Sequence, residues 1–454
     1  IFEQAKPEIT AEPVLGPDSL ADGAGTSIYG TVLRDQGVYR MWYQAWPKDW
    51  DGRDISYVGY AESEDGDTWK KPSLGLVDHG GTSNNLCDLG FHSPSVYIDP
   101  KASGDFRYRG TGYVQPGGVG APKGITIRGY YTAHSADGIH WQLDSNLPTW
   151  PNGDVITSIY HAGQERAIVS LKRHLRIGGI PRRTIWNAEQ LDGEWSQDCA
   201  ALLPDEFDDT SAISRGFVSG DYYGMGMMAA GQGTVGFIWQ FRHSMPRTAE
   251  RGYGVFGNVD VSLAYQEGRG HAWHHSPGRK DFIIHGETDW MKGGIYTSSC
   301  PVDAGDNQRL YFSGTPYSHG WYLDSTWQRR EDRRNQMLDQ GFAFIGYASW
   351  KRDRLFSYRA DPDGTIDFEI HVASERSELC LNYAAEKIGG IRAEIVDQEG
   401  FEHTTSIPLT GDELSSPVRW KSGNALPARS GENLLIRLHV EQASIYSFEV
   451  RPIA

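Results

Sequence analysis

Acidic residues that stand beside strand-like runs are the chain's best candidates for chemistry. Cleavage of a glycosidic bond needs two carboxyl groups, one as the acid and one as the base or nucleophile. Asp154 directly precedes the run VITSIYHAG. Glu287 and Asp289 lie beside Trp290, whose apolar surface can raise a carboxyl pKa, as an acid requires. We therefore predict that Asp154 pairs with Glu287 or Asp289, with Asp22 as a further catalytic candidate, although each carboxylate could simply cap a turn.

A second group of residues suits the binding of a sugar. Sugar sites combine aromatic platforms with Arg, His and other hydrogen-bond donors. Cations gathered in a chain of net charge −16 suggest a substrate that carries a carboxylate or another anion. Ordinary ion pairing with Asp and Glu explains them equally well. The candidate substrate-binding residues are Trp46, Trp50, Arg53, His92, Lys172, His174, Arg182, Trp239, Arg242 and His319.

Motifs for metals and cofactors are missing from the sequence. The four cysteines form no C-x-x-C pair, and there is no H-E-x-x-H string. The glycine-rich pieces GGVG and RIGG lack the strand–turn–helix context of a phosphate loop. We therefore expect no required cofactor and assign no metal ligands. A Ca²⁺ ion, structural or in a central channel, is an open alternative.

Composition narrows the class of protein. The chain has 454 residues with 15 Trp, 23 Tyr and 54 Gly, which favours an all-β protein with many short strands. Its acidity does not suit nucleic acid, whose phosphates need clustered Lys and Arg. No apolar run nears 18 residues, so we expect no membrane span. Because the first residue is Ile1 and not Met, we expect a trimmed N-terminus, which leaves a signal peptide open.

A repeated Asp-Gly turn predicts the architecture that positions these residues. YAESEDGDTWKKP (60–72) has relatives at 131–143 and 186–197, and two degraded copies follow. Each copy has the pattern of a strand, a tight turn and a strand, and follows two further strand-like runs. Five such four-stranded units, spaced by roughly 55–85 residues, predict a five-bladed β-propeller. We assign Asp65 and Trp69 of the first copy a structural role, in which Asp65 caps the turn and Trp69 packs between blades.

The propeller topology also predicts where a ligand binds. The loops before the inner strands share one face with the loops that join second and third strands. The long loops, such as QAWPKDWDGRD, lie on that face, and loops longer than a hairpin needs are often functional. Asp154 should therefore reach the mouth of the channel. We also expect the segment 8–15 to supply an outer strand that closes the ring.

From about residue 360 the pattern changes. IRAEIVDQEG, NLLIRLHVEQ and ASIYSFEV alternate apolar and polar residues, as half-buried strands do. Such strands with Gly and Pro between them suit a β-sandwich. We therefore predict an all-β fold with a five-bladed β-propeller catalytic domain over 1–358 and a β-sandwich domain over 359–454. The sandwich could brace the propeller or support a homo-oligomer.

Several strings resemble a known group of enzymes. They are RMWY (40–43), YAES-x-DG-x-x-W-x-KP, LGLV (74–77) and LIRLHVEQASIYSF (435–448). They resemble five-bladed glycoside hydrolases of the invertase, fructan-hydrolase and arabinanase type, most closely uncharacterised bacterial fructosidase-like proteins with a C-terminal β-sandwich. The resemblance implies a soluble bacterial protein, cytoplasmic or periplasmic, that acts in polysaccharide degradation. The fructosidase strings N-D-P-N, R-D-P and E-C are absent, so the catalytic residues of that family do not transfer by motif.

Three functions fit these observations, all with a carbohydrate ligand. The first, which we favour, is a glycoside hydrolase that cleaves a terminal or small sugar unit with paired carboxylates in the propeller funnel. The second is a carbohydrate lyase or epimerase-like enzyme on a uronate, with His92 or His174 and a Tyr as base and acid. The third is a non-catalytic glycan-binding propeller.

Overall fold

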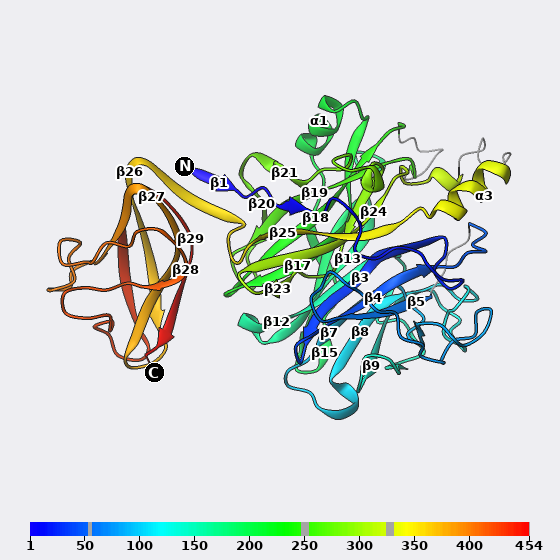
Figure 1. Cartoon of the computed structure of the whole chain (residues 1–454), viewed down its shortest axis with the longest axis horizontal. Helices are drawn as coiled ribbons and strands as arrows, with labels where there is room; N and C mark the ends of the chain where they lie inside the picture. The colour runs from blue at the N-terminus through cyan, green and yellow to red at the C-terminus, as the bar shows by residue number, and fades with distance from the viewer. Residues whose placement is uncertain (53–56, 247–253, 324–330, 454) are drawn as a thin grey trace. The chain divides into compact units, whose positions relative to one another are not determined.

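The computed structural model describes residues 1–52, 57–246, 254–323 and 331–453, and they are mostly antiparallel strands (Figure 1). The described residues include two short α-helices, α1 (Glu206–Ser214) and α3 (Glu331–Gln340). None of the described helices is long and apolar enough to cross a membrane. The chain divides into a propeller unit, Pro7–Ala304 with Arg309–Ser349, and a second unit, Trp350–Ala454 with Ile1–Lys6 and Gly305–Gln308. The sequence-based division was at 358/359.

The first three blades are antiparallel sheets whose strands follow one another in chain order. Blade 1 contains β3 (Gly25–Asp35), β4 (Val38–Trp46), β5 (Val58–Ser63) and β6 (Leu86–Cys87). Blade 2 contains β7 (His92–Ile98), β8 (Tyr108–Val114), β9 (Gly129–Ser135), β10 (Gln142–Leu143) and β11 (Trp150–Pro151). Blade 3 contains β12 (Ile156–His161), β13 (Arg166–Ile177), β14 (Ile180–Leu191), β15 (Glu194–Trp195) and β16 (Cys199–Leu202). Nearly continuous burial along strands such as β3, β9 and β12 reflects packing on both blade faces.

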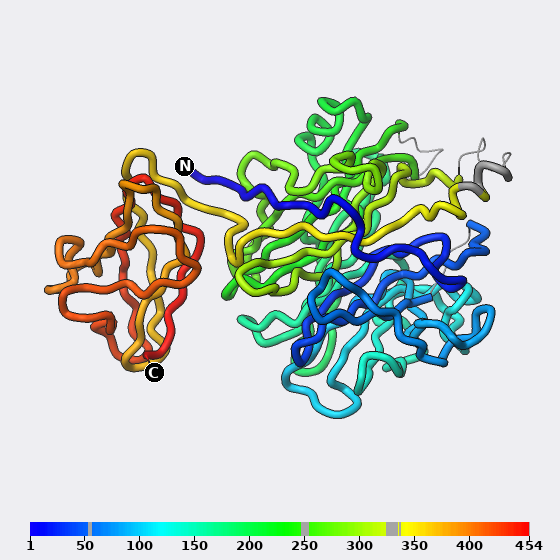
Figure 2. The backbone as a smooth tube through the Cα atoms, viewed as in Figure 1, coloured from blue at the N-terminus to red at the C-terminus, as the bar shows by residue number. Residues whose placement is uncertain are grey.

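The last two blades are joined by one parallel bridge between Val259 and Gly294. Blade 4 contains β17 (Ser219–Ala230), β18 (Gly233–His243), β19 (Gly257–Gln266), β20 (Trp273–His275) and β21 (Asp281–Ile283). Blade 5 contains β22 (Gly294–Thr297), β23 (Val302–Ala304), β24 (Asn307–Thr315), β25 (Phe344–Lys351) and β2 (Glu8–Ile9). Figure 2 shows the N-terminal segment running beside a segment from late in the chain, and this late segment includes β25. Glu8 of β2 lies opposite Ser349 of β25. This confirms the prediction that the segment 8–15 supplies the closing outer strand.

Small hydroxyl side chains join the inner strands around the propeller axis. The Ser158 amide donates to Ser95 Oγ at 2.7 Å, which links blades 2 and 3. The Thr157 hydroxyl donates to the Met225 carbonyl at 2.5 Å, which links blades 3 and 4. The Ser299 amide donates to the Gly30 carbonyl at 3.0 Å and closes the ring between blades 5 and 1. The five-bladed propeller predicted from the repeat is therefore confirmed.

The recurring Asp-Gly turn has the structural role predicted for it. Asp65 Oδ1 accepts the amides of Asp67 and Thr68, each at 2.8 Å. The Trp69 indole donates to the Gly66 carbonyl and packs edge-on against Tyr311 of blade 5. The second copy repeats this arrangement at 137–141. The turns thus hold neighbouring blades together.

The second unit is a single five-stranded sheet folded around its own core. Its order is β1 (Phe2–Gln4), β26 (Phe356–Val372), β29 (Glu432–Pro452), β27 (Ser377–Ile395) and β28 (Asp412–Pro417). The long strands change register at bulges, for example between Ala385 and Gly390 of β27. Residues from both halves of the bent strands, such as Leu381 and Ala393, share one apolar cluster around Trp420. The two halves of the sheet therefore form the layers of the predicted β-sandwich.

Candidate functional site

A cavity of about 330 Å³ lies at the propeller axis, where the five inner strands begin. Each blade contributes at least one residue from or beside its inner strand, among them Tyr29, His92, Asp154, Tyr223 and Tyr296. This is the face that the topology predicted for a ligand. Inner strands begin here because the preceding loops deliver the chain to the axis from the outer edge of the previous blade.

Asp154 and Lys172 form an ion pair on the cavity wall. Asp154 lies two residues before the start of β12, and Lys172 lies on the neighbouring strand β13. The Lys172 Nζ lies 2.9 Å from Asp154 Oδ2 and 2.8 Å from Oδ1. The lysine side chain is 2% exposed, whereas the aspartate side chain is 42% exposed, toward the cavity. Both residues line the cavity, and the carboxylate contributes most of the surface that the pair offers to a ligand.

Burial and neighbouring charges set the protonation of this pair. Burial lowers the pKa of Lys172 to about 8 even though Asp154 acts to raise it. Burial alone would raise the pKa of Asp154, but the Lys172 ammonium outweighs it and holds that pKa below its ordinary value. Asp154 is consequently an ionised carboxylate near neutral pH. It suits the role of base or nucleophile and not that of acid.

Two histidines of the cavity, His174 and His319, are neutral at physiological pH. Burial, followed by the charges of Lys172 and Arg183, lowers the pKa of His174 to about 3. Burial and then Arg183 do the same for His319, whose pKa is also about 3. Neutral imidazoles can accept a proton, so both residues have the form that a general base needs.

Tyr223 and His319 form a hydrogen-bonded pair in the cavity. His319 Nδ1 lies 2.5 Å from the Val255 carbonyl, which can only accept, so Nδ1 carries the proton. Nε2 must then be the acceptor for the Tyr223 hydroxyl, 3.0 Å away. The Lys172 ammonium stands 3.7 Å from the centre of the Tyr223 ring. Burial keeps the pKa of Tyr223 well above its ordinary value, so the phenol is a proton carrier and not an anion.

Aromatic side chains form the remaining wall. Trp46 ends β4, and its ring meets Trp50 of the following loop edge-on, with centroids 5.1 Å apart. Trp50 in turn packs against Trp321 and Tyr322. All four rings line the cavity, which provides the apolar platforms on which sugar rings commonly stack.

Seven of the predicted site residues meet at this cavity. Its lining includes Asp154, Trp46, Trp50, His92, Lys172, His174 and His319. Arg53 lies outside the described residues. The sequence analysis selected these side chains because it placed them at strand ends or in loops on the face predicted for a ligand.

The other predicted carboxylates are not at the cavity. Asp22 is fully buried, where it accepts hydrogen bonds from Ser19, Tyr43 and Lys71. Glu287 is exposed, and Asp289 pairs with Lys292 at the surface at 2.6 Å. Trp290 does not shield either of them, because its ring is buried against Phe312. The expected pair of Asp154 with Glu287 or Asp289 is therefore not formed, and Asp154 is the only carboxylate in the described lining.

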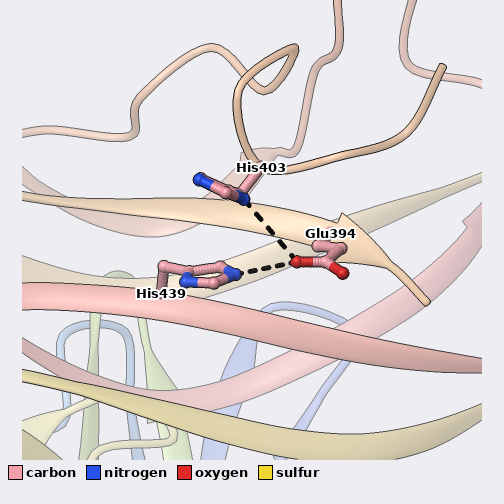
Figure 3. Close-up of side chains that lie close together, drawn as sticks. All are labelled: Glu394, His403 and His439. Carbon is pink, nitrogen blue, oxygen red and sulfur yellow. Dashed lines mark hydrogen bonds and ion pairs between the residues drawn. The ribbon is translucent and has the colours of Figure 1, made fainter.

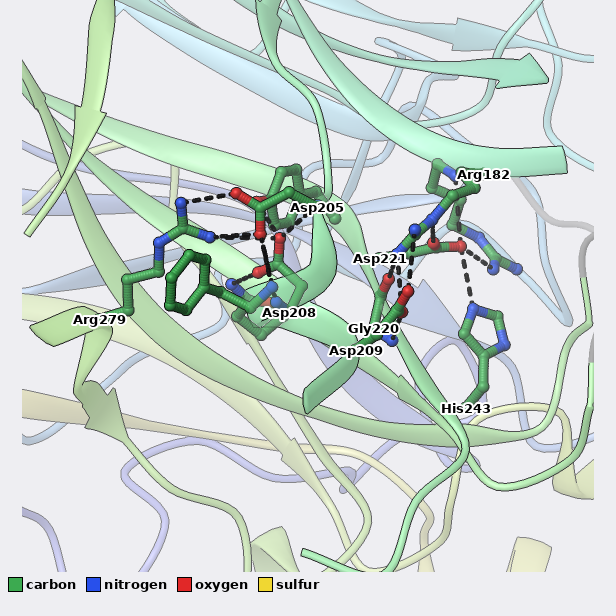
Figure 4. Close-up of polar contacts among 12 residues, drawn as sticks. Arg182, Asp205, Asp208, Asp209, Gly220, Asp221, His243 and Arg279 are labelled. Carbon is green, nitrogen blue, oxygen red and sulfur yellow. Dashed lines mark hydrogen bonds and ion pairs between the residues drawn. The ribbon is translucent and has the colours of Figure 1, made fainter. Parts of the chain in front are cut away.

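Three predicted binding residues support the fold instead. The two terminal guanidinium nitrogens of Arg182 donate to the two carboxylate oxygens of Asp209. Arg182 also donates to the Gly220 carbonyl and to the Asp221 carboxylate (Figure 4). Arg242 is held by Asp260 at 2.6 Å and Asp281 at 2.8 Å. Trp239 is fully buried and donates to Thr297 at 2.8 Å. Buried charges in proteins are generally paired in this way, and all three residues lie outside the cavity lining.

Arg183 and the cavity tyrosines are residues that the sequence analysis missed. Arg183 lies opposite His174 in the β13–β14 ladder, so the two side chains share a face. Placing the turn at Gly178-Gly179 gives this register from sequence, and alternation then selects Arg183 over Arg182. The tyrosines had a weaker signal, since Tyr29, Tyr223 and Tyr296 each fall within an inner-strand run.

Calcium has a poor set of ligands here. Ca²⁺ takes about six to eight oxygen ligands, several of them carboxylates. The described lining offers one carboxylate, already paired with Lys172.

Comparison with known proteins gives structural likeness only. No known sequence family and no curated protein matches the chain. A glycosyl hydrolase from Bacteroides ovatus is 13% identical, with a TM-score of 0.45, over 78% of this chain and 94% of its own. An exo-inulinase from Aspergillus awamori is 12% identical, with a TM-score of 0.42, over 98% and 99%. A GH32 β-fructofuranosidase from Bombyx mori is 10% identical, with a TM-score of 0.43, over 99% and 94%. At these values the likeness concerns the fold, and the site must be interpreted from its own geometry.

Proposed function

We propose that the protein is a carbohydrate-active enzyme that cleaves a glycosidic bond in a saccharide carrying an acidic group. The observation that carries this proposal is the Asp154–Lys172 pair, which stands in an axial cavity walled by tryptophan and tyrosine rings. The rings supply stacking surface, and the pair supplies an ionised carboxylate next to a proton-bearing amine.

The charge of the cavity supports an acidic substrate. Lys172 and Arg183 face one carboxylate in the described lining, although the whole chain has a net charge of −16. A substrate carboxylate or sulfate next to these two cations would make charge-assisted hydrogen bonds in a partly desolvated place. A neutral sugar would make no such charge-assisted bonds.

Hydrolysis is the first candidate reaction. Asp154 would act as the base that activates water or as the nucleophile, because its pKa lies below the ordinary value. The described lining holds no second carboxyl, so a proton for the leaving oxygen would come from another group. Lys172, whose pKa is about 8, is the proton-bearing side chain beside Asp154.

Elimination at a uronate is the second candidate, favoured by the Tyr223–His319 pair. The neutral His319 imidazole, or Tyr223 acting through it, could take the proton next to the uronate carboxylate, and a phenol proton could reach the leaving oxygen. Lys172 and Arg183 would hold the carboxylate. This route needs no second carboxyl group.

A product assay tests the proposal and separates the two routes. The full chain should be incubated with acidic and neutral oligosaccharides, and the products analysed for new reducing ends and for unsaturated sugars that absorb ultraviolet light. Hydrolysis gives only the former, whereas elimination gives both. Asp154→Asn should reduce turnover by at least about 100-fold, the usual scale for losing acid–base catalysis. The surface carboxylate variant Asp289→Asn serves as the matched control.

Two outcomes would count against this function. Full activity in Asp154→Asn would remove Asp154 from the chemistry. Saturable binding of an acidic oligosaccharide without any product would favour a glycan-binding propeller over an enzyme.

A further inference from the structure

Three side chains of the sandwich unit converge on one point outside the propeller. Glu394 is on β27, His439 is on the adjacent strand β29, and His403 is in the loop that follows β27 (Figure 3). In the strand ladder Glu394 lies opposite Arg437, two residues from His439, so both side chains lie on the same face of the sheet. Figure 3 shows His403 pointing to the same carboxylate from the loop.

The distances between the three groups fit one small cation. His439 Nε2 lies 2.9 Å from Glu394 Oε2, and His403 Nδ1 lies 3.7 Å from the same oxygen. The potential ligand atoms all lie within 4.8 Å of one another. A tetrahedral Zn²⁺ with bonds of about 2.0–2.1 Å holds its ligand atoms about 3.3 Å apart. The two measured separations lie on either side of that value, so small side-chain rotations would suffice.

The chemistry of the donors selects the metal. Two imidazole nitrogens and a carboxylate form a common three-ligand set for Zn²⁺, with water as the fourth ligand. Ca²⁺ and Mg²⁺ prefer oxygen ligands alone. The imidazole rings of His403 and His439 lie 4.4 Å apart at 33°, so both rings reach the same place beside Glu394. The side chains are 23–47% exposed, so an ion can enter from solvent.

The loop that carries His403 is held close to the strands by contacts other than the histidine. The Ala393 amide donates to Ser406 Oγ at 3.0 Å, next to Glu394 in the chain. The Ser406 amide in turn donates to the His403 carbonyl at 3.2 Å. Phe401 packs edge-on against Trp420 in the sandwich core. These contacts place the third ligand before any metal binds, which lowers the ordering cost of binding.

We propose that Glu394, His403 and His439 form a zinc site that ties the loop between β27 and β28 to the sandwich sheet. The ion brings together a loop ligand and two strand ligands. It therefore stabilises the folded sandwich by binding the native state alone. The site lies in a different unit from the proposed sugar site and does not depend on that function.

Zinc titration of the tag-free full chain tests this inference. Protein stripped with a chelator should bind one Zn²⁺ in calorimetry, and zinc should raise its thermal unfolding temperature. Loss of a residue that hydrogen-bonds to a metal ligand weakens metal binding by roughly 10- to 100-fold. His403→Gln removes a ligand itself, so it should weaken zinc binding by more than that. His371→Gln is the matched control, because His371 is another histidine of the same sheet, bonded to Asn433. It should bind zinc as the wild type does.

Each other outcome overturns the proposal. These are no binding to the wild type, equal binding in His403→Gln, or an equal loss in His371→Gln. Circular dichroism checks that the variants are folded. If His403→Gln is not, Glu394→Gln keeps the shape and a hydrogen-bond acceptor while removing the charged ligand, and should show the same loss.

Discussion

Replacing Asp154 by Asn should make stability depend on pH in a window where the wild type does not. Lys172 is buried, and its pKa of about 8 depends on Asp154 to raise it. In the variant that support is lost, so the pKa of Lys172 in the folded state falls below 8. The unfolded chain keeps a lysine pKa of about 10.4. Between the new folded pKa and pH 8, the unfolded variant therefore binds one more proton than the folded variant, and stability rises with pH.

The size of the effect follows from the cost of neutralising Lys172. Each pH unit of difference corresponds to about 1.4 kcal/mol. At pH 7, which is one unit below the wild-type Lys172 pKa of about 8, deprotonating the amine costs about 1.4 kcal/mol. The pH-dependent part of the stability loss cannot exceed that value. At pH 6 the limit is about 2.7 kcal/mol, and above pH 8 this part vanishes. Deprotonation thus caps the usual cost of breaking a buried pair, which is about 3–5 kcal/mol.

Urea unfolding at pH 6, 7 and 9, followed by tryptophan fluorescence, measures this difference between variant and wild type. Lys172→Met removes the titrating amine, so Asp154→Asn should add no pH-dependent loss in that background. A difference that stays constant from pH 6 to 9 would refute the reasoning. So would a pH dependence that survives in the double variant.

Two further predictions concern the neighbouring arginines Arg182 and Arg183 and a glycine of the recurring turn. Arg182→Gln should destabilise the fold by about 3 kcal/mol, since it leaves Asp209 and the buried Asp221 short of a partner, whereas Arg183→Gln should chiefly weaken binding of an acidic oligosaccharide. Thermal unfolding and calorimetric titration of both variants check this, and a larger binding defect in Arg182→Gln would contradict it. Gly138→Ala should cost more than about 1 kcal/mol in chemical unfolding, because its φ is +80° and the new Cβ would stand 2.7 Å from the Trp42 ring. Gly124→Ala, with a φ of +83° and open space around it, isolates the backbone part, and an equal cost in both would show that the Trp42 contact is unimportant.

The architecture could be predicted because the same short turn motif recurs along the chain. An Asp that caps its own turn and a Trp that follows it act within a few residues, so each copy carries the same pattern. The position of Asp154 could be predicted for a similar reason, because a residue just before an inner strand lies at the mouth of the propeller channel. The preference of sequence reasoning for Asp154 therefore rested on topology, which the fold confirms.

The partners of Asp154 could not be found in this way. Whether Trp290 shields a neighbouring carboxyl depends on which way its ring turns, and the ring stacks on Phe312 of another strand. Such a choice is made by contacts between distant segments, and local propensity carries little information about it. Arg183 is different, because the local register of the Gly178-Gly179 hairpin decides that Arg183 and not Arg182 faces the cavity.

The arrangement behind Arg183 bears on our proposal that the cavity binds an acidic sugar. Asp221 is fully buried and could claim the Arg183 guanidinium, yet their closest approach is 3.5 Å. Its carboxylate already accepts hydrogen bonds from His243 at 2.9 Å and from Arg182 at 3.3 Å (Figure 4). It also accepts a hydrogen bond from the Arg183 backbone amide at 3.2 Å. An acidic sugar that drew the Arg183 guanidinium toward the cavity would therefore leave Asp221 satisfied. Binding of the anion would not carry the penalty of orphaning a buried carboxylate, and this makes Arg183 a better recognition residue than the more tightly held Arg182.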